Sequence, residues 1–389
     1  MLVRFLSCRE RFRLRYILGL EPHDKWVKTL GYGNMWHVCE EAHAGHDIVA
    51  AKGIAGAVLA DNLWKAKLLD HTNHQFVKYP FQREEIEKWY RVCMVQFPEY
   101  IKYWSEHSDV KNRIPLEQEQ VFDVAYTLPS GRVVRLRGKR DSVDLITDDI
   151  TGPDGGVYLQ ENKSKGDIDK EDVERQLKFD LQTMTYTIAL LEDHKADGSG
   201  PPYWDWMSDI LQRNIGPKDF KGVRYNVVRR PLSGGKGNIS PHKGKCTKPV
   251  LSKSKKTPGK VLKESVITPA ETADEFYERL RRDYIADDPA HWFFRVRSEV
   301  SDQDIKVFRE TCLDPLLENL CWWYEQTVLD TIGVPYQRID DTPPPFNYRT
   351  PFGVWSALEE GGSTEYDAYL ATGSEAGLQR VETLFGELQ

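Results

Sequence analysis

Paired cysteines are missing from the sequence. Six cysteines are present, at positions far apart in the chain: Cys8, Cys39, Cys93, Cys246, Cys312 and Cys321. No two of them form a Cys-x-x-Cys pair, so the sequence gives no sign of a tetrahedral zinc site or of a disulfide framework. We expect ordinary buried or free thiols.

Long hydrophobic runs are also missing. No stretch approaches the ~18 apolar residues that a membrane span needs. Near the N-terminus, Arg9, Arg11 and Arg13 interrupt the apolar residues, which excludes the apolar core of a signal peptide. We therefore expect an amphipathic helix in this segment, no membrane partner and a cytoplasmic location.

Three common enzyme motifs are absent. The sequence has no Gly-x-Gly-x-x-Gly after a strand pattern, no P-loop ending in Gly-Lys-Ser/Thr, and no Gly-x-Ser-x-Gly. These absences argue against dinucleotide binding, an ATP motor within the chain, and a serine hydrolase of the α/β type. The sequence therefore offers no support for an unrelated α/β enzyme of these classes.

The charge is unevenly distributed along the chain. The 389 residues carry a net charge of −7, with 40% hydrophobic and 29% charged residues, as in ordinary globular proteins. However, the segment Arg229–Lys263 holds eleven Lys or Arg and no Asp or Glu. Such a segment can contact the phosphates of a nucleic acid, although a solvated linker has the same composition. It contains no Phe, Tyr or Trp, so we do not expect it to stack on bases.

The periodicity of apolar residues predicts an α/β protein. Residues 1–115 are mainly helical in pattern, and the aromatic residues near positions 83–106 recur at helical spacing, which is typical of a core. Residues 116–230 alternate as strands, with a helix at about Lys170–Glu192 before the last strand. Residues 231–263 have the Gly, Ser, Pro and Lys content of a flexible basic insertion, and residues 264–389 are helical again. We expect one domain, 1–389, with a central mixed sheet flanked by helices.

Three charged residues in the strand region form the central candidate site. Asp141 stands twenty residues before Glu161, and Lys163 follows two residues later. A hairpin can bring the two carboxylates together, and residues two apart on a strand point to the same face. Carboxylates are ligands for Mg²⁺ or Mn²⁺, and a lysine beside them can orient or help to deprotonate a water molecule. The same spacing also arises by chance on hairpins with charged, solvated faces.

Other residues strengthen this hypothesis. Glu161 and Lys163 end a strand that is otherwise apolar, where burial is expected. Gln182 and Tyr186 are four apart and share one face of the next helix, from which they can reach the lysine, the water or a phosphate. His37 lies on an upstream segment with a helical pattern. A lone histidine is more often a core or surface residue than a ligand.

Taken in order, these residues resemble a known family. The series Gly33–His37, Gly138–Asp141, Glu161–Lys163 and Gln182–Tyr186 is similar to the motifs of RecB-like nucleases in the PD-(D/E)XK superfamily. The opening LSCRERFRLRYILGLEP resembles the short helix that begins many such enzymes, and the segments after residue 222 resemble phage- and plasmid-borne members. The resemblance implies an α/β, restriction-endonuclease-like fold with helical N-terminal and C-terminal extensions. It covers nearly the whole chain.

The resemblance also implies an activity and roles for residues. It implies a metal-dependent deoxyribonuclease, an exonuclease in recombination, repair or phage DNA processing. His37, Asp141, Glu161 and the backbone carbonyl of Asn162 would bind Mg²⁺ or Mn²⁺. Lys163 would be the catalytic lysine, supported by Gln182 and Tyr186.

The resemblance leaves partners and one cofactor to consider. DNA is the expected partner, together with a recombination or single-strand-binding protein. The alternative is a catalytically inactive nuclease fold that binds DNA or protein, against which the intact Asp141, Glu161 and Lys163 argue. Some relatives hold an iron–sulfur cluster through one N-terminal and three C-terminal cysteines. Here only Cys8 stands in a matching place, so we expect no cluster.

Overall fold

The computed structural model describes residues 2–22, 25–51, 63–106, 113–146, 156–171, 173, 180–195, 219–232, 239–246, 250–251, 253, 256, 261–263, 267–325, 366, 369 and 372–381. The chain divides into two compact units. The sheet unit comprises Trp26–Tyr126 and Arg135–Ile305, and the terminal unit comprises Met1–Lys25, Thr127–Val134 and Lys306–Gln389. The single domain expected for residues 1–389 stays a prediction.

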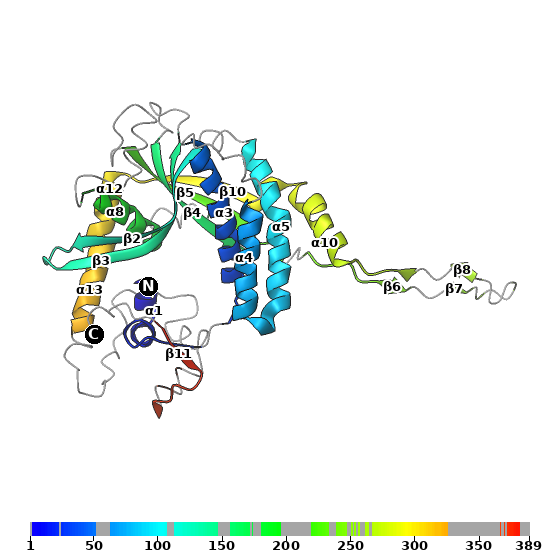
Figure 1. Cartoon of the computed structure of the whole chain (residues 1–389), viewed down its shortest axis with the longest axis horizontal. Helices are drawn as coiled ribbons and strands as arrows, with labels where there is room; N and C mark the ends of the chain where they lie inside the picture. Colours follow the sequence, from blue (N-terminus) through cyan, green and yellow to red (C-terminus); the bar gives the residue numbers. More distant parts are fainter. Residues whose placement is uncertain are drawn as a thin grey trace. The chain divides into compact units, whose positions relative to one another are not determined.

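A five-stranded mixed sheet forms the centre of the sheet unit, in the order β10-β5-β4-β3-β2 (Figure 1). Its strands are β2 (Arg113–Thr127), β3 (Val133–Ile146), β4 (Gly156–Lys165), β5 (Phe220–Arg229) and β10 (Phe293–Glu299). β4 pairs with β5 in parallel, whereas β3–β4 and β5–β10 pairs are antiparallel. The α/β class with a mixed sheet, predicted from the sequence, is confirmed.

Helices cover both faces of this sheet. Adjacent residues of β5 point to opposite faces. Asn226 contacts Glu40 on α3 (Lys28–Ala51) and Tyr100 on α5 (Arg83–Ser105), whereas Tyr225 contacts Thr183 on α8 (Leu181–Lys195). The helices α3 and α5 therefore lie on one face and α8 on the other. The predicted helix at Lys170–Glu192 corresponds to α8, and most of its first half lies outside the described residues.

The main core lies between the sheet and the helices α3, α5, α4 (Leu63–Lys78) and α10 (Ala273–Leu280). As the helical spacing predicts, the aromatic side chains of α5 are buried: Trp89, Phe97, Tyr100 and Trp104. Trp36 on α3 packs edge-to-face against Phe97 and Tyr100. The aromatic residues that recur along α5 therefore pack in the core against the central sheet.

The basic segment contains more order than the sequence predicts. Four short strands occur between β5 and α10: β6 (Lys245–Cys246), β7 (Val250–Leu251), β8 (Val261–Lys263) and β9 (Ile267–Thr268). β6 pairs with β9 and β7 pairs with β8, both antiparallel. Figure 1 shows these pairs in line along one thin two-stranded extension. The few β-branched and apolar residues in the segment account for the pairing. The Gly and Lys content of the segment had instead led to the prediction of a flexible insertion.

A strand also interrupts the region that the sequence predicts to be helical. β10 forms the edge of the sheet beside β5, and its sequence, FFRVRSE, contains the aromatic and β-branched residues that favour strands. In the sequence, β10 is preceded by η3 (Pro80–Gln82), η5 (Arg281–Ile285) and α11 (Pro289–Trp292). It is followed by α12 (Asp302–Phe308), η6 (Arg309–Leu313) and α13 (Asp314–Tyr324). The helical prediction for 264–389 is therefore wrong at β10.

The terminal unit begins with short helical segments in place of one long helix: α1 (Leu2–Ser7), α2 (Arg9–Phe12) and η1 (Arg13–Ile17). β1 (Leu20–Pro22) pairs antiparallel with β11 (Leu378–Arg380). Leu14, Leu20, Tyr366 and Leu378 form a small buried cluster around this pair. Among the described residues, no helix is both long and apolar enough to cross a membrane.

Candidate metal centre

The pairing of β3 with β4 brings Asp141 beside the end of β4. Ser142 lies opposite Gln160, so the next position along the hairpin sets Asp141 opposite Glu161. The backbone N–H of Asn162 donates a hydrogen bond of 2.7 Å to Asp141 Oδ2. Asp141 and Glu161 are both buried, at 8% and 2% exposure. Two carboxylates are thus held together in a place that largely excludes water.

Lys163 and Gln182 both contact Glu161. Lys163 Nζ lies 2.5 Å from Glu161 Oε1, and Gln182 Nε2 donates to the same oxygen at 2.8 Å. Lys163 Nζ also lies 3.3 Å from Gln182 Oε1. Glu161 and Lys163 point to the same face because they are two apart on β4, and Gln182 reaches them from α8. The structure therefore brings these three predicted site residues together.

Tyr186 lies one turn after Gln182 and packs beside the strands. Its ring lies 5.3 Å from the ring of Phe122 on β2. Gly138 allows this packing, since an added Cβ would stand 2.7 Å from Phe122 and 3.0 Å from Tyr186. Burial raises the pKa of the Tyr186 hydroxyl above its ordinary value, and nearby Glu161 raises it further. Tyr186 is therefore a neutral group at the border of the site.

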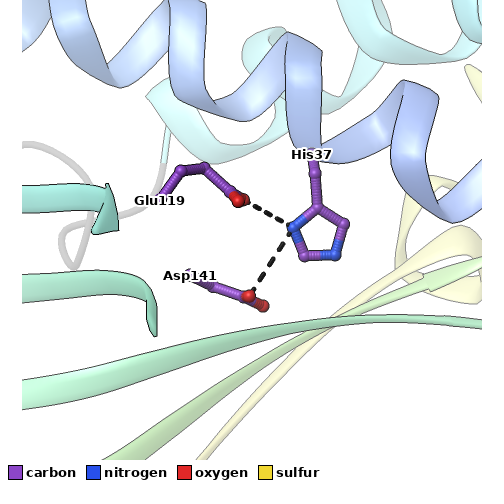
Figure 2. A group of neighbouring side chains, drawn as sticks. All are labelled: His37, Glu119 and Asp141. Atoms are coloured by element: carbon purple, nitrogen blue, oxygen red, sulfur yellow. Dashed lines mark hydrogen bonds and ion pairs between the residues drawn. The ribbon is translucent and has the colours of Figure 1, made fainter. Parts of the chain in front are cut away.

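His37 approaches Asp141 from α3 (Figure 2). Its Nδ1 lies 2.7 Å from Glu119 Oε1 and 3.7 Å from Asp141 Oδ1. Gly33, one turn earlier on α3, lies close to β4: an added Cβ would stand 3.5 Å from Ser164 Oγ, an ordinary van der Waals contact. The ligand atoms of His37, Glu119 and Asp141 all lie within 4.8 Å of one another. Among the described residues, this is the one group of His, Cys, Asp or Glu side chains close enough to hold a metal ion.

Glu119 is the residue that the sequence did not reveal. It lies on β2, its Oε2 pairs with Lys139 Nζ at 2.6 Å, and its φ of 49° is in the left-handed region. Glu117, two residues earlier, pairs instead with Arg140. The strand pattern EQEQ offered two carboxylates at equivalent positions, so alternation alone could not select one. The backbone conformation that directs Glu119 toward His37 leaves no mark in the pattern.

The carboxylates repel one another in the absence of a cation. Burial raises the pKa of Glu161 to about 7, and the neighbouring Asp141 adds to this rise. Burial likewise raises the pKa of Asp141, opposed in part by His37 and the Asn162 N–H. Burial alone would lower the pKa of His37, but the hydrogen bond to Glu119 and the charge of Asp141 raise it to about 9. The two buried carboxylates therefore destabilise each other's charged form, and the cationic His37 and Lys163 offset this only in part.

The residues present fit a divalent cation. Glu161 Oε2 is buried and accepts no hydrogen bond from any residue that the structure describes. An unsatisfied buried carboxylate oxygen is costly unless a cation meets it. Hard cations such as Mg²⁺ and Mn²⁺ prefer carboxylate oxygens. The Asn162 side chain bonds Asn226 on the face toward α3 and α5, so Asn162 can serve this site only through its backbone. Glu161 lies outside the 4.8 Å group of His37, Glu119 and Asp141.

Comparison with known proteins places this geometry in a family. The family model described as the PD-(D/E)XK nuclease superfamily matches residues 1–293, which include every residue of the candidate site. No curated protein matches the chain in sequence. The sheet, the paired acidic residues on β3 and β4 and the lysine two residues further along agree with this match. The chain therefore belongs to the PD-(D/E)XK nuclease superfamily.

Proposed function

We propose that the chain is a divalent-metal-dependent DNA nuclease that hydrolyses phosphodiester bonds. One observation carries the proposal: two buried carboxylates, Asp141 and Glu161, stand together with raised pKa values, and one oxygen of Glu161 has no hydrogen-bond partner. Burying such a pair destabilises the fold unless a cation is taken up. A bound divalent cation would offset the destabilisation caused by these two buried carboxylates.

The proposed metal ligands are those that the family resemblance implies, with one addition. Asp141, Glu161, His37 and the backbone carbonyl of Asn162 would hold Mg²⁺ or Mn²⁺, and Glu119 is a further candidate because it lies in the same group as His37 and Asp141. A bound divalent ion supplies a water molecule of lowered pKa and neutralises charge on the phosphate. With the ion bound, His37 would have to be neutral, since a protonated imidazole has no free lone pair.

Lys163 acts on the attacking water or on the phosphate charge. Its pKa is raised: burial would lower it, but the charge of Glu161 outweighs that effect, so the ammonium stays charged. We infer that it orients the water and balances the negative charge that develops on the phosphate. Gln182 fixes both Lys163 and Glu161 through its amide, and Tyr186 borders the site. These roles for Gln182 and Tyr186 are positioning roles.

The finer activity is an exonuclease of the RecB-like branch, acting in recombination, repair or phage DNA processing. Its support is the order of the motifs and the similarity to phage- and plasmid-borne members. The Lys-rich extension around β6 to β9 supports DNA as the partner, because phosphate contacts supply most of the affinity of proteins for DNA. A recombination or single-strand-binding protein as a second partner stays a prediction.

Digestion of end-labelled linear DNA and of circular DNA, each with and without Mg²⁺, tests the proposal. We expect loss of linear DNA from its ends, survival of covalently closed circles, and no cleavage in excess EDTA. Nicked circles would instead indicate an endonuclease. Binding without any cleavage by the wild-type chain would favour the catalytically inactive binding module. Undiminished cleavage in EDTA would contradict the metal mechanism, and the Lys163→Ala variant controls for contaminating nucleases.

A further inference from the structure

Three cations stand in a row on β3 and lead toward the candidate metal centre. Arg135, Arg137 and Lys139 occupy alternate positions, so they share one face of the strand about 7 Å apart. Their side chains are 54%, 38% and 52% exposed. Leu136, between the two arginines, is buried, and so is Arg140, the residue after Lys139. The strand therefore presents these three cations to solvent, and Asp141 follows Lys139 two positions later.

Carboxylates from β2 hold these cations in place. Asp123 accepts from Arg135 Nε at 2.6 Å and from Arg137 Nε at 3.0 Å. Glu119 pairs with Lys139 at 2.6 Å. Arg135 also donates from Nη2 to the backbone oxygen of Asp123 at 3.4 Å. A guanidinium carries five N–H donors in a planar fork, a geometry that suits both carboxylate and phosphate oxygens. Side chains that are already held in position lose less conformational entropy when they bind a ligand.

Stability alone does not account for the row. Exposed ion pairs contribute little to stability, and a face built only for solubility would mix both signs along each strand. Here the three cations lie on β3 and the two carboxylates on β2, so the exposed side chains along this part of β3 are all positive. Between the carboxylates, Val121 is 67% exposed and offers an apolar contact. Charge complementarity therefore favours a polyanion along β3.

We propose that Arg135, Arg137 and Lys139, here called the cation row, bind successive phosphates of one nucleic-acid strand and guide it to Asp141. The inference rests on the proposed function, because it takes the substrate of the metal centre as its ligand. The cation row binds the backbone, so it adds affinity and direction without reading sequence.

The test compares two double variants of the full chain. Arg135→Gln/Arg137→Gln removes two charges of the row and leaves Lys139 and its partner Glu119 intact. The matched control is Arg282→Gln/Arg380→Gln, which removes two exposed arginines that are also paired with carboxylates, Asp283 and Glu375. DNA binding is measured across a salt series in EDTA, and KM and kcat are measured with Mg²⁺.

We expect the row variant to lower the log–log salt slope by about 1 per lost contact and to raise KM severalfold. Its kcat at saturating DNA and its melting temperature should match those of the control. If the salt slope and KM of the row variant equal those of the control, the proposal that the cation row binds phosphates is wrong. Wild-type binding that depends on the row without any cleavage would instead overturn the proposed function and leave the row standing, so the two failures are distinguishable.

Discussion

Two sets of buried polar residues lie next to each other on the same strands, and they differ in how completely their carboxylate oxygens are paired. The first set is the candidate site, with the buried Asp141 and Glu161 beside the half-buried Lys163. The second set, one to three residues away, contains Asp144 and Gln160 with Arg224 of β5. Asp144 Oδ1 accepts from Ser142 at 2.6 Å, and its Oδ2 meets Arg224 at 3.2 Å and Arg113 at 2.9 Å. Both oxygens of this carboxylate are satisfied within the chain.

The candidate site differs in one oxygen atom. Glu161 Oε1 accepts hydrogen bonds from Lys163 and Gln182, whereas Glu161 Oε2 accepts none within the described part of the chain. Gln160, the preceding residue, is instead saturated by Arg224, which donates from both Nε and Nη2. Since the two sets share strands and burial, the environment alone does not explain the difference. Under the proposed function, the paired set serves the fold, and Glu161 Oε2 is the atom that a bound cation would contact.

The largest effect should follow from breaking the paired set. We expect Asp144→Asn to lower the free energy of unfolding by about 3–5 kcal/mol, because Arg224 and Arg113 would keep buried charges without a counter-charge. Urea unfolding followed by circular dichroism measures this loss. Asp141→Asn is the matched control and should unfold near the wild-type midpoint in the absence of metal. Equal destabilisation by both substitutions would contradict the comparison.

The reverse experiment removes activity and leaves the fold. Asp141→Ala and Lys163→Ala should each lower the cleavage rate by two or more orders of magnitude, about 2.7 kcal/mol or more of transition-state stabilisation, with unchanged melting behaviour. Single-turnover cleavage with Mg²⁺ is the measurement. Near-normal rates in either variant would mean that the site has been misplaced.

The third prediction uses pH to expose the repulsion within the incomplete set. The pKa of Glu161 in the folded protein is raised to about 7, so the metal-free folded state binds a proton that the unfolded chain has lost. Stability from this group is complete below the ordinary glutamate pKa and is lost as pH rises toward 7. In EDTA, the contribution of Glu161 to the melting temperature should therefore fall over this range.

The Glu161→Gln variant isolates this contribution. It cannot ionise at this position, so the difference in melting temperature between it and the wild type should grow as pH rises. Saturating Mg²⁺ should reduce the difference, since the ion stabilises the charged form. A difference that stays constant with pH would show that Glu161 does not titrate in this range.

The smallest effect is expected at His37. His37→Ala should lower cleavage by roughly tenfold, because a carboxylate-held ion keeps partial occupancy. The loss should shrink as the Mg²⁺ concentration rises, which titration of the cleavage rate against Mg²⁺ measures. A loss as large as that of Asp141→Ala at every Mg²⁺ concentration would show that the histidine does more than help to hold the ion.

The sequence predicted those parts of the molecule that depend on local periodicity. Alternation on β3 and β4 predicted that Asp141 and Glu161 would meet, because hairpin geometry follows from chain direction and pleat. Helical spacing likewise predicted the aromatic core along α5 and the approach of Gln182 to Lys163. These features require only nearby residues and regular backbone.

Features that depend on distant partners escaped prediction. Glu119 is chosen over Glu117 by an irregular backbone conformation, and Asp144 is neutralised by arginines at positions 113 and 224. β10 joins the edge of the sheet after a long insertion, where nothing local indicates the partner strand. Burial and pairing across such separations are set by tertiary packing, which single-sequence patterns do not contain.

The left-handed backbone at Glu119 has a consequence for how this protein would respond to selection. A non-glycine residue in this conformation costs about 1–3 kcal/mol, and asparagine or glycine relieves much of that cost. Random mutagenesis screened for heat resistance alone should therefore enrich replacements of Glu119 by Gly or Asn. A library screened for DNA cleavage should retain the glutamate if its carboxylate serves the metal centre. Divergent outcomes from the two libraries would identify position 119 as one where stability is sacrificed to activity.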